Sequence, residues 1–304
     1  MGNAIEALNL DEILKGGQLP ALPQSAINLL QLSKDPNIGP AEFAVPIEAD
    51  PGLTSQVLKF VNSSYFGFSR EISSVRQAIT LVGMRTIKNF ALWSAVFSLM
   101  PNPSCGAFDL RCLWQDSLRR ALFAKAFALR LKSKEAEEPF AAALLQDMAV
   151  PLLAKQYPAE YAELFESRAN GKVRLSQLEQ DKFGYSHAEV AACMCRQWSL
   201  PETIASLIEQ HTKADELVPK ASTLPNETAV ALSAMLPASH DENWEECGQL
   251  DDYCRRATES SLDVPELLAQ VDSDFDEIAP ILKVSPPKQT LVDSYRQYFE
   301  NCSS

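Results

Sequence analysis

Helix-start signals recur along this chain, and strand signals are nearly absent. Asp50 stands directly before Pro51, and Asp109 and Ser186 also precede apolar stretches. An Asp or Ser at this position accepts a hydrogen bond from a free backbone N–H, and proline suits the first helical position because it has no N–H to satisfy. No alternating stretch is bounded by an Asn-Gly or Asp-Gly turn. The sequence therefore predicts an all-α fold.

The spacing of apolar residues supports this fold class. Leu53, Val57, Phe60 and Val61 fall on one face of a helix that begins at Asp50. Further helices are expected from Pro23, from Pro40, between Ser74 and Gly83, over 84–100, from Asp109 to about Leu131, over 136–155 with a disturbance at Pro151, from Ser186, and from Pro201. These helices predict a multi-helix bundle.

The break at about 101–108 divides the chain into an N-terminal helical layer, to about residue 100, and a helical bundle from about residue 109. We expect the two parts to pack on each other because the face of 78–100 is heavily apolar. The expected organisation has four parts: a leader helix over 1–16, a main domain over 17–212, a helical extension over 213–284, and a polar tail over 285–304 that lies on the surface or frays.

Charge and composition exclude several functional classes. The net charge is −13, and 240–280 holds thirteen Asp or Glu against Arg255 and Arg256. We interpret that segment as a solvated surface that aids solubility. A chain this acidic is repelled by phosphate backbones and by anionic membranes. The most apolar run, 90–100, is shorter than the roughly 20 residues that span a bilayer.

The location expected from the sequence is the cytoplasm. The chain has seven cysteines, an odd number, and its first residues lack the pattern of a signal peptide. Free thiols in a reducing compartment are therefore expected. No glycine-rich phosphate loop and no GxSxG motif is present.

Several segments, taken in order, resemble the HDOD family, the HD-related output domains of bacterial signalling. They are LPALPQSAINLLQLSKDP, EADPGLTSQVLKFVNSSYFG, SSVRQAITLVGMRTIKNFAL, LWQDS, AALLQDM and FGYSHAEV…WSLPETI…IEQH. The resemblance covers roughly 17–212, about two thirds of the chain, and it rests on the order and spacing of the motifs. It implies a fold of the HD phosphohydrolase type, an N-terminal helical layer followed by an HD-like bundle.

The resemblance also implies a degenerate metal site. In active HD relatives, several His residues, a His-Asp pair and a late Asp hold divalent metals. At the matching positions this chain has Asp116 for the first His, Gln146 before Asp147 for the His-Asp pair, His187 and His211 for later His residues, Thr212 for an adjacent His, and Ala234 for the late Asp. Ala149 and Val150 replace the Gly-Lys that usually follows.

The loss of donors leads us to expect no functional metal and no other cofactor. Gln is a poor ligand for transition metals, which select imidazole nitrogen and carboxylate oxygen. The remaining candidates are Asp147, His187 and His211, with Asp116 as a fourth, and such a set could in principle hold zinc. The favoured interpretation of these residues is structural: His187 lies at a helix start beside Ser186, His211 lies at a helix end, and Asp147 is a buried, hydrogen-bonded carboxylate.

Three functions remain open on the sequence. The favoured one is a non-catalytic signalling module of the bacterial cytoplasm that binds a kinase, receiver or regulator in trans, or a small effector. The second is a metal-dependent phosphohydrolase that acts on a nucleotide or a cyclic dinucleotide. The third is DNA binding through 74–99, near which Arg70, Arg76, Arg85 and Lys88 cluster. The overall charge argues against the third.

Overall fold

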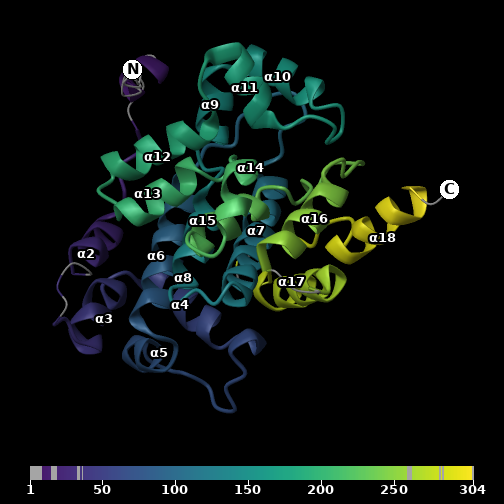
Figure 1. Ribbon diagram of the computed structural model, residues 1–304. Helices are drawn as coiled ribbons and strands as arrows, with labels where there is room; N and C mark the ends of the chain where they lie inside the picture. Colours follow the sequence, from purple (N-terminus) through teal and green to yellow (C-terminus); the bar gives the residue numbers. More distant parts are fainter. Residues whose placement is uncertain are drawn as a thin grey trace.

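The computed structural model of the protein describes residues 9–14, 19–32, 35, 37–258, 262–280, 282 and 284–302. Every regular element in these ranges is a helix, which confirms the all-α prediction (Figure 1). The expected leader helix over 1–16 lies largely outside the described residues. Its described part contains the short helix α1 (Leu10–Ile13).

Short helices form the N-terminal layer, drawn in purple and blue in Figure 1. They are α2 (Gln24–Leu32), α3 (Pro40–Glu48), α4 (Pro51–Val61), the 3-10 helix η1 (Ser64–Phe66), α5 (Val75–Val82) and α6 (Met84–Leu99). The predicted caps are present. The Asp50 carboxylate accepts from the Leu53 N–H at 3.0 Å, and the Ser74 hydroxyl accepts from the Gln77 N–H at 3.2 Å.

The long helix α7 (Leu110–Arg130) is the axis of the second part, and α8, α15 and α17 pack against it. Its small side chains Ser117, Ala121, Ala124 and Ala128 are all buried. Small residues allow neighbouring backbones to approach closely. The two parts share one core: the Phe97 and Trp114 rings lie 4.1 Å apart, and the Asn89 amide donates to the Glu137 carbonyl at 2.9 Å.

The single helix predicted over 136–155 is wrong. The chain forms α8 (Glu137–Leu145) and α9 (Val150–Gln156), with a turn over 146–149 between them. Pro151 does not disturb a continuous helix. It lies in the first turn of α9, where a missing N–H costs nothing. The turn matters because it carries Asp147.

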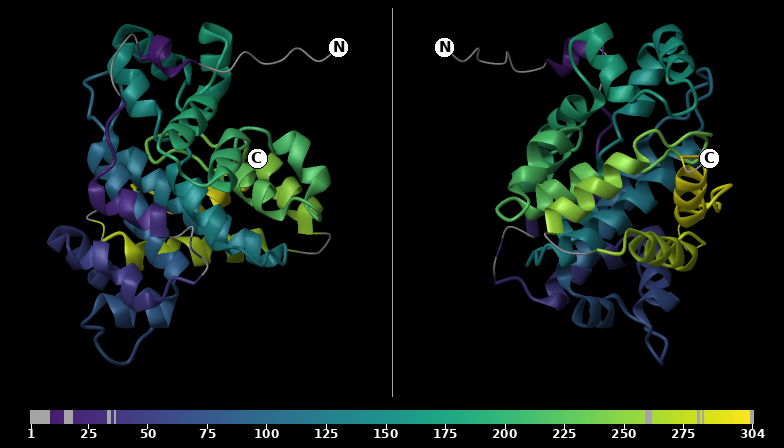
Figure 2. Two further views of the ribbon diagram at one scale, coloured as in Figure 1. Left: turned by 90° about the vertical axis from the view of Figure 1, so that its left-hand side faces the viewer. Right: turned by 45° about the vertical axis from the view of Figure 1, so that its right-hand side comes forward.

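The remaining helices complete the bundle and extend it toward the C-terminus (Figure 2). They are α10 (Pro158–Ser167), α11 (Leu175–Phe183), α12 (His187–Gln197), α13 (Glu202–Glu209), α14 (Ala214–Leu217), the 3-10 helix η2 (Val218–Lys220), α15 (Pro225–Ser233), α16 (Cys247–Thr258), α17 (Val264–Ile278) and α18 (Leu291–Cys302).

The polar tail expected over 285–304 contains an ordered helix where it is described. The backbone N–H groups of Leu291 and Val292 donate to the Asp272 carboxylate, at 3.0 and 3.1 Å, so Asp272 supplies the start of α18 with acceptors. Leu291 and Tyr295 are buried in contact with the core. One apolar face therefore holds α18 on the bundle, although most of its residues are polar.

The expected DNA-binding segment folds as α5 and α6, and its apolar faces are buried. Val75, Ala78 and Ile79 of α5 and Ile87 and Phe90 of α6 belong to the core. All seven cysteines are free thiols. Within the described ranges, no helix combines the length and the apolar character that crossing a membrane requires.

Candidate functional site

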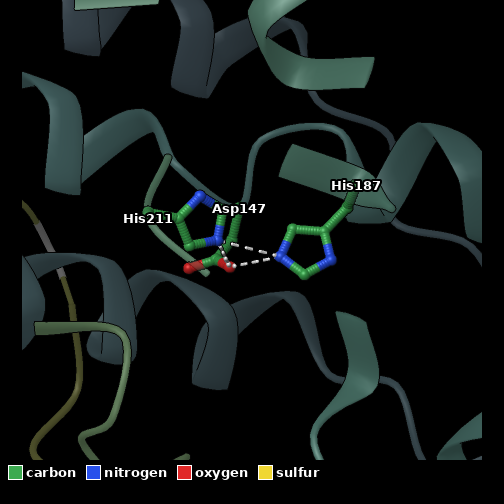
Figure 3. A group of neighbouring side chains, drawn as sticks. All are labelled: Asp147, His187 and His211. Atoms are coloured by element: carbon green, nitrogen blue, oxygen red, sulfur yellow. Dashed lines mark hydrogen bonds and ion pairs between the residues drawn. The ribbon is translucent and has the colours of Figure 1, made fainter. Parts of the chain in front are cut away.

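Asp147, His187 and His211 come together in the bundle although they are far apart in sequence (Figure 3). Asp147 lies in the turn between α8 and α9, His187 begins α12, and His211 follows α13 directly. His187 Nε2 lies 3.2 Å from Asp147 Oδ1 and 3.2 Å from His211 Nε2. All three side chains are buried, and their ligand atoms lie within 4.8 Å of one another. This cluster could hold a metal ion.

His187 is held in place by Glu179 of α11. Glu179 Oε2 accepts from the His187 backbone N–H at 2.7 Å and from its Nδ1–H at 2.6 Å. Glu179 Oε1 accepts from the Tyr161 hydroxyl at 2.6 Å. At the start of α12, the Ser186 backbone N–H donates to Glu189 Oε2 at 2.7 Å, as in a capping box. Glu179 therefore orients His187 through two hydrogen bonds, one from the backbone N–H and one from the ring Nδ1.

The tautomer of His211 follows from its partner. Its Nδ1 lies 2.6 Å from the Ile208 carbonyl oxygen, which can only accept. Nδ1 therefore carries the proton, and Nε2 presents a lone pair to His187. His211 Nε2 also lies 4.0 Å from Asp147 Oδ1. Each imidazole thus has its Nδ1 engaged and its Nε2 directed at the centre of the cluster.

Arg120 of α7 supplies the positive charge of the site. Its Nη1 makes an ion pair with Asp147 Oδ2, and both side chains are almost entirely buried. One oxygen of Asp147 therefore faces a guanidinium, and the other faces His187. With Glu179 included, the cluster contains two negatively charged carboxylates. The positive groups are one guanidinium and one imidazole that is able to take a proton.

The electrostatic environment separates the two histidines. Burial by itself would lower the pKa of His187, but the Glu179 and Asp147 carboxylates raise it to about 10. Burial and the positive charge of His187 lower the pKa of His211 to about 3. Burial would raise the pKa of Asp147, yet Arg120 and His187 hold it well below its usual range. Near neutral pH the pair is therefore one imidazolium and one neutral imidazole.

These shifts predict that protein stability is greatest near pH 6.5. Because the folded pKa of His187 is raised, its contribution is full below 6.5 and is lost as the pH rises toward 10. Because the folded pKa of His211 is lowered, unfolding is favoured as the pH falls from 6.5 toward 3. Each limb should slope by up to about 1.4 kcal/mol per pH unit.

Urea unfolding between pH 4 and pH 10, on the order of one measurement per pH unit, would record both limbs. The His187→Gln variant should lose most of the alkaline slope and keep part of the acid one, because burial still lowers the pKa of His211. An alkaline limb of equal steepness in wild type and variant would contradict the assignment.

The other sequence-predicted positions do not join the cluster. Asp116 lines the same cavity, but its Oδ1 accepts from the Ser239 backbone N–H at 2.7 Å and also from the Ser239 hydroxyl. Burial raises the pKa of Asp116 in spite of nearby Arg120. The Gln146 side chain is buried outside the cavity lining, and its oxygen lies 3.4 Å from the Ser233 hydroxyl. Thr212 and Ala234 line the cavity.

Sequence reasoning missed Arg120 and Glu179. Arg120 follows Asp116 by four residues, so it lies on the same face of α7, and that spacing was visible. Glu179 had no comparable signal. It precedes His187 by eight residues and reaches it through the turn that joins α11 to α12.

Two loops, 168–174 and 234–246, cover the cavity, which has a volume of about 120 Å3. Arg168 donates to Asp241 at 2.6 Å, Arg174 pairs with Glu246, and the Asn243 N–H donates to the Asn170 carbonyl at 3.1 Å. The loops are therefore fastened to each other over the cluster.

Gly171 allows this close approach of the two loops. Its φ is +96°, and a Cβ there would lie 2.5 Å from the Asn243 carbonyl oxygen. Gly171→Ala should destabilise the protein by about 2 to 4 kcal/mol, because the left-handed backbone and the clash both add cost. Gly184→Ala is the matched control. Gly184 has a φ of +77° with nothing within 4 Å, so only the backbone cost of about 1 to 2 kcal/mol applies. Equal losses in urea unfolding would contradict the close approach.

A comparison with known protein families matches residues 19–214 to the HDOD domain. The chain belongs to the HDOD family. The resemblance expected from the sequence motifs is therefore confirmed.

Solved structures share the HDOD fold of this chain. An HDOD domain protein of unknown function from Geobacter sulfurreducens is 24% identical, with a TM-score of 0.70 over 90% of this chain and 96% of that one. The "Putative phosphohydrolase" of Shewanella amazonensis SB2B is 20% identical, with a TM-score of 0.68 over 90% and 97%. The "Putative signal transduction protein" of Marinobacter aquaeolei VT8 is 20% identical, with a TM-score of 0.64 over 91% and 60%.

Two curated relatives are longer than the region that they share with this chain. An uncharacterised protein of Treponema pallidum is 22% identical over 194 residues, which are 64% of this chain and 37% of that protein. The uncharacterised protein YuxH of Bacillus subtilis is 41% identical over 80 residues, which are 26% of this chain and 19% of YuxH.

Proposed function

We propose that this HDOD protein is a non-catalytic signalling module that works by binding a partner in trans or a small effector. The observation that carries the proposal is the buried ion pair between Arg120 and Asp147. In this view, the guanidinium has taken the place of the divalent cation that an HD hydrolase would hold at Asp147.

The charge balance of the site supports this view. Arg120 and protonated His187 already neutralise Asp147 and Glu179. A dication bound to Asp147 would lie beside the guanidinium. Two like unit charges about 4 Å apart repel by roughly 4 kcal/mol at an effective dielectric of 20, and a dication doubles that cost. Metal binding is therefore opposed even though three donor atoms are present.

The replaced donors support the same conclusion. Gln146 stands where a His is expected, and Ala234 where the late Asp is expected. One carboxylate oxygen of Asp116 accepts two hydrogen bonds from Ser239, one from its backbone N–H and one from its hydroxyl. Among the described residues, Asp147, His187 and His211 are the donors that lie together at the cluster, too few to bind two metals.

The names of relatives fit a signalling role, and we extend them to this chain as a proposal. The Marinobacter neighbour is named a signal transduction protein. We propose that a kinase, receiver or regulator is the partner, and that 17–212 is the signalling domain, with 213–284 as an extension and 285–304 as a C-terminal segment.

A metal-dependent phosphohydrolase is the second candidate, and one observation favours it. Both imidazoles have a hydrogen-bonded Nδ1, the arrangement that usually orients metal-binding histidines. Two nitrogens about 2.1 Å from a tetrahedral zinc lie about 3.4 Å apart, close to the 3.2 Å found here. Asp147, His187 and His211 would hold such a metal, which would supply an activated water.

An activity assay separates the two candidates. Purified protein would be incubated with a cyclic dinucleotide or with bis(p-nitrophenyl) phosphate in Mn2+, Fe2+ or Zn2+. We expect no turnover above the buffer rate. Turnover that disappears in the His211→Gln variant would contradict the proposal and favour the second candidate.

A further inference from the structure

The cavity above the cluster contains hydrogen-bond donors that no described residue satisfies. Its floor includes Arg120, and its roof includes Arg168 and His240. Its volume of about 120 Å3 is well above the roughly 10–15 Å3 that one water requires. The cavity therefore has room for a small organic molecule or for several waters.

Arg168 fixes the tautomer of the neutral His240 ring. Its Nη2 donates to Asp241 Oδ2 at 2.6 Å, and its Nη1 lies 3.2 Å from His240 Nε2. A guanidinium only donates, so His240 Nε2 accepts and Nδ1 carries the proton in the neutral ring. That Nδ1 is buried, with no hydrogen-bond partner among the described residues. Arg168 Nε is likewise buried, with no hydrogen-bond partner among the described residues.

Arg120 adds a third donor on the opposite side. Its single hydrogen bond to a described residue runs from Nη1 to Asp147, and its Nε is buried without a partner. Buried polar groups in folded proteins are nearly always paired, with protein, water or ligand. Three unpaired N–H groups around one cavity therefore call for acceptor atoms inside it, from water or from a bound molecule.

The carboxylates around the cavity are already engaged. Asp116 accepts from Ser239, Glu246 pairs with Arg174, and one oxygen of Asp241 accepts from Arg168. Asp241 Oδ1 is the fully buried carboxylate oxygen of the described lining that has no hydrogen bond, and it lies 3.6 Å from His240 Nε2. Among the buried side-chain atoms of the lining residues that lack a partner, three are donors and one is an acceptor, and two of those donors belong to guanidinium groups.

We propose that this cavity binds a small organic oxyanion, a molecule with a phosphate or carboxylate group held by Arg120, Arg168 and His240. The inference rests on the proposed function, since it names the chemistry of the effector. Guanidinium groups form their strongest hydrogen bonds with these two anions. Phe108, Phe165, Leu236 and Trp244 form apolar walls, which suit an aromatic or aliphatic body.

Isothermal titration calorimetry with phenyl phosphate, benzoate and benzyl alcohol tests the proposal. The three probes share an aromatic ring and differ in the polar group. At least one of the two anions should bind about tenfold or more tightly than benzyl alcohol, and its affinity should fall as salt is added, since ions screen the guanidinium groups. The better anion identifies the effector as a phosphate or a carboxylate.

Variants locate the site. Arg168→Gln should weaken the better anion by about tenfold or more, the usual loss of one charged hydrogen bond. His240→Ala removes a side chain that makes one hydrogen bond, so this variant is expected to fold. It keeps the test valid if the Arg168→Gln variant fails to fold. Arg196→Gln is the control, because Arg196 pairs with Glu202 and Glu209 outside the cavity lining. It should leave the affinity unchanged.

The outcomes for the inference and for the proposed function can be told apart. If neither anion binds, or if benzyl alcohol binds equally well, the oxyanion site is wrong, while the non-catalytic proposal stands. If phenyl phosphate binds and is hydrolysed, the oxyanion site is supported, and the non-catalytic proposal is contradicted. Loss of binding in Arg196→Gln alone would overturn the location.

Discussion

Asp147→Asn is expected to cost about 3 to 5 kcal/mol of folding free energy, because it leaves the buried Arg120 guanidinium without its anion. The asparagine keeps the size and one acceptor oxygen, so the loss reports the charge. Urea unfolding at pH 7 measures it. The structure gives Arg120 no second hydrogen-bonded carboxylate among the described residues.

The control is Asp252→Asn. Asp252 pairs with Arg256 at 3.1 Å on the surface, and exposed pairs contribute about 0 to 1 kcal/mol. In the double variant Asp147→Asn, Arg120→Met, much of the loss should be recovered, since no buried charge is left unpaired at that point. A loss no greater than that of the control would contradict the buried ion pair.

Glu179→Gln is expected to lower the folding free energy by a similar amount, about 3 kcal/mol or more, because it also leaves a buried cation without one of its anions. Glu179 is buried and accepts from Tyr161 and twice from His187. When Glu179 is replaced by a neutral glutamine, His187 loses the first of the two carboxylates that raise its pKa. The pKa of His187, followed by imidazole NMR, should fall from about 10 by more than one unit.

Glu163→Gln is the matched control for this variant. Glu163 pairs with Lys182 at 2.5 Å, and its side chain is largely exposed, so the change should be small. If Glu179→Gln leaves the pKa of His187 at about 10, another group must hold the proton, and the described network is wrong.

The helix positions were largely predictable because the signals are local. The side chains of Asp50, Ser74 and Asp109 accept the expected hydrogen bonds from backbone N–H groups, whereas the Ser186 hydroxyl donates to Glu189. The failure at 136–155 has a local cause as well. Pro151 marks the start of a helix, and nothing nearby distinguishes that role from a disturbance within one.

The site was predictable only in part. Asp147, His187 and His211, which the motif positions single out, lie together in the structure. Spacing places Arg120 on the face of α7 that carries Asp116, but its pairing with Asp147 depends on how α7 packs against the turn between α8 and α9, which no local pattern encodes. The interpretation of 240–280 as a solvated surface is also incomplete. Asp241 is a buried partner of Arg168, and Asp272 caps α18.

Metal content measured by inductively coupled plasma mass spectrometry tests the central claim most directly, that Arg120 replaces the cation. Wild-type protein, prepared without chelator and dialysed against Mn2+, Fe2+ and Zn2+ in turn, should retain less than about 0.1 equivalent, because the guanidinium opposes a dication. Arg120→Gln, which removes that charge but leaves all three donors, should retain more. One full equivalent in the wild-type protein, lost in His211→Gln, would contradict the account.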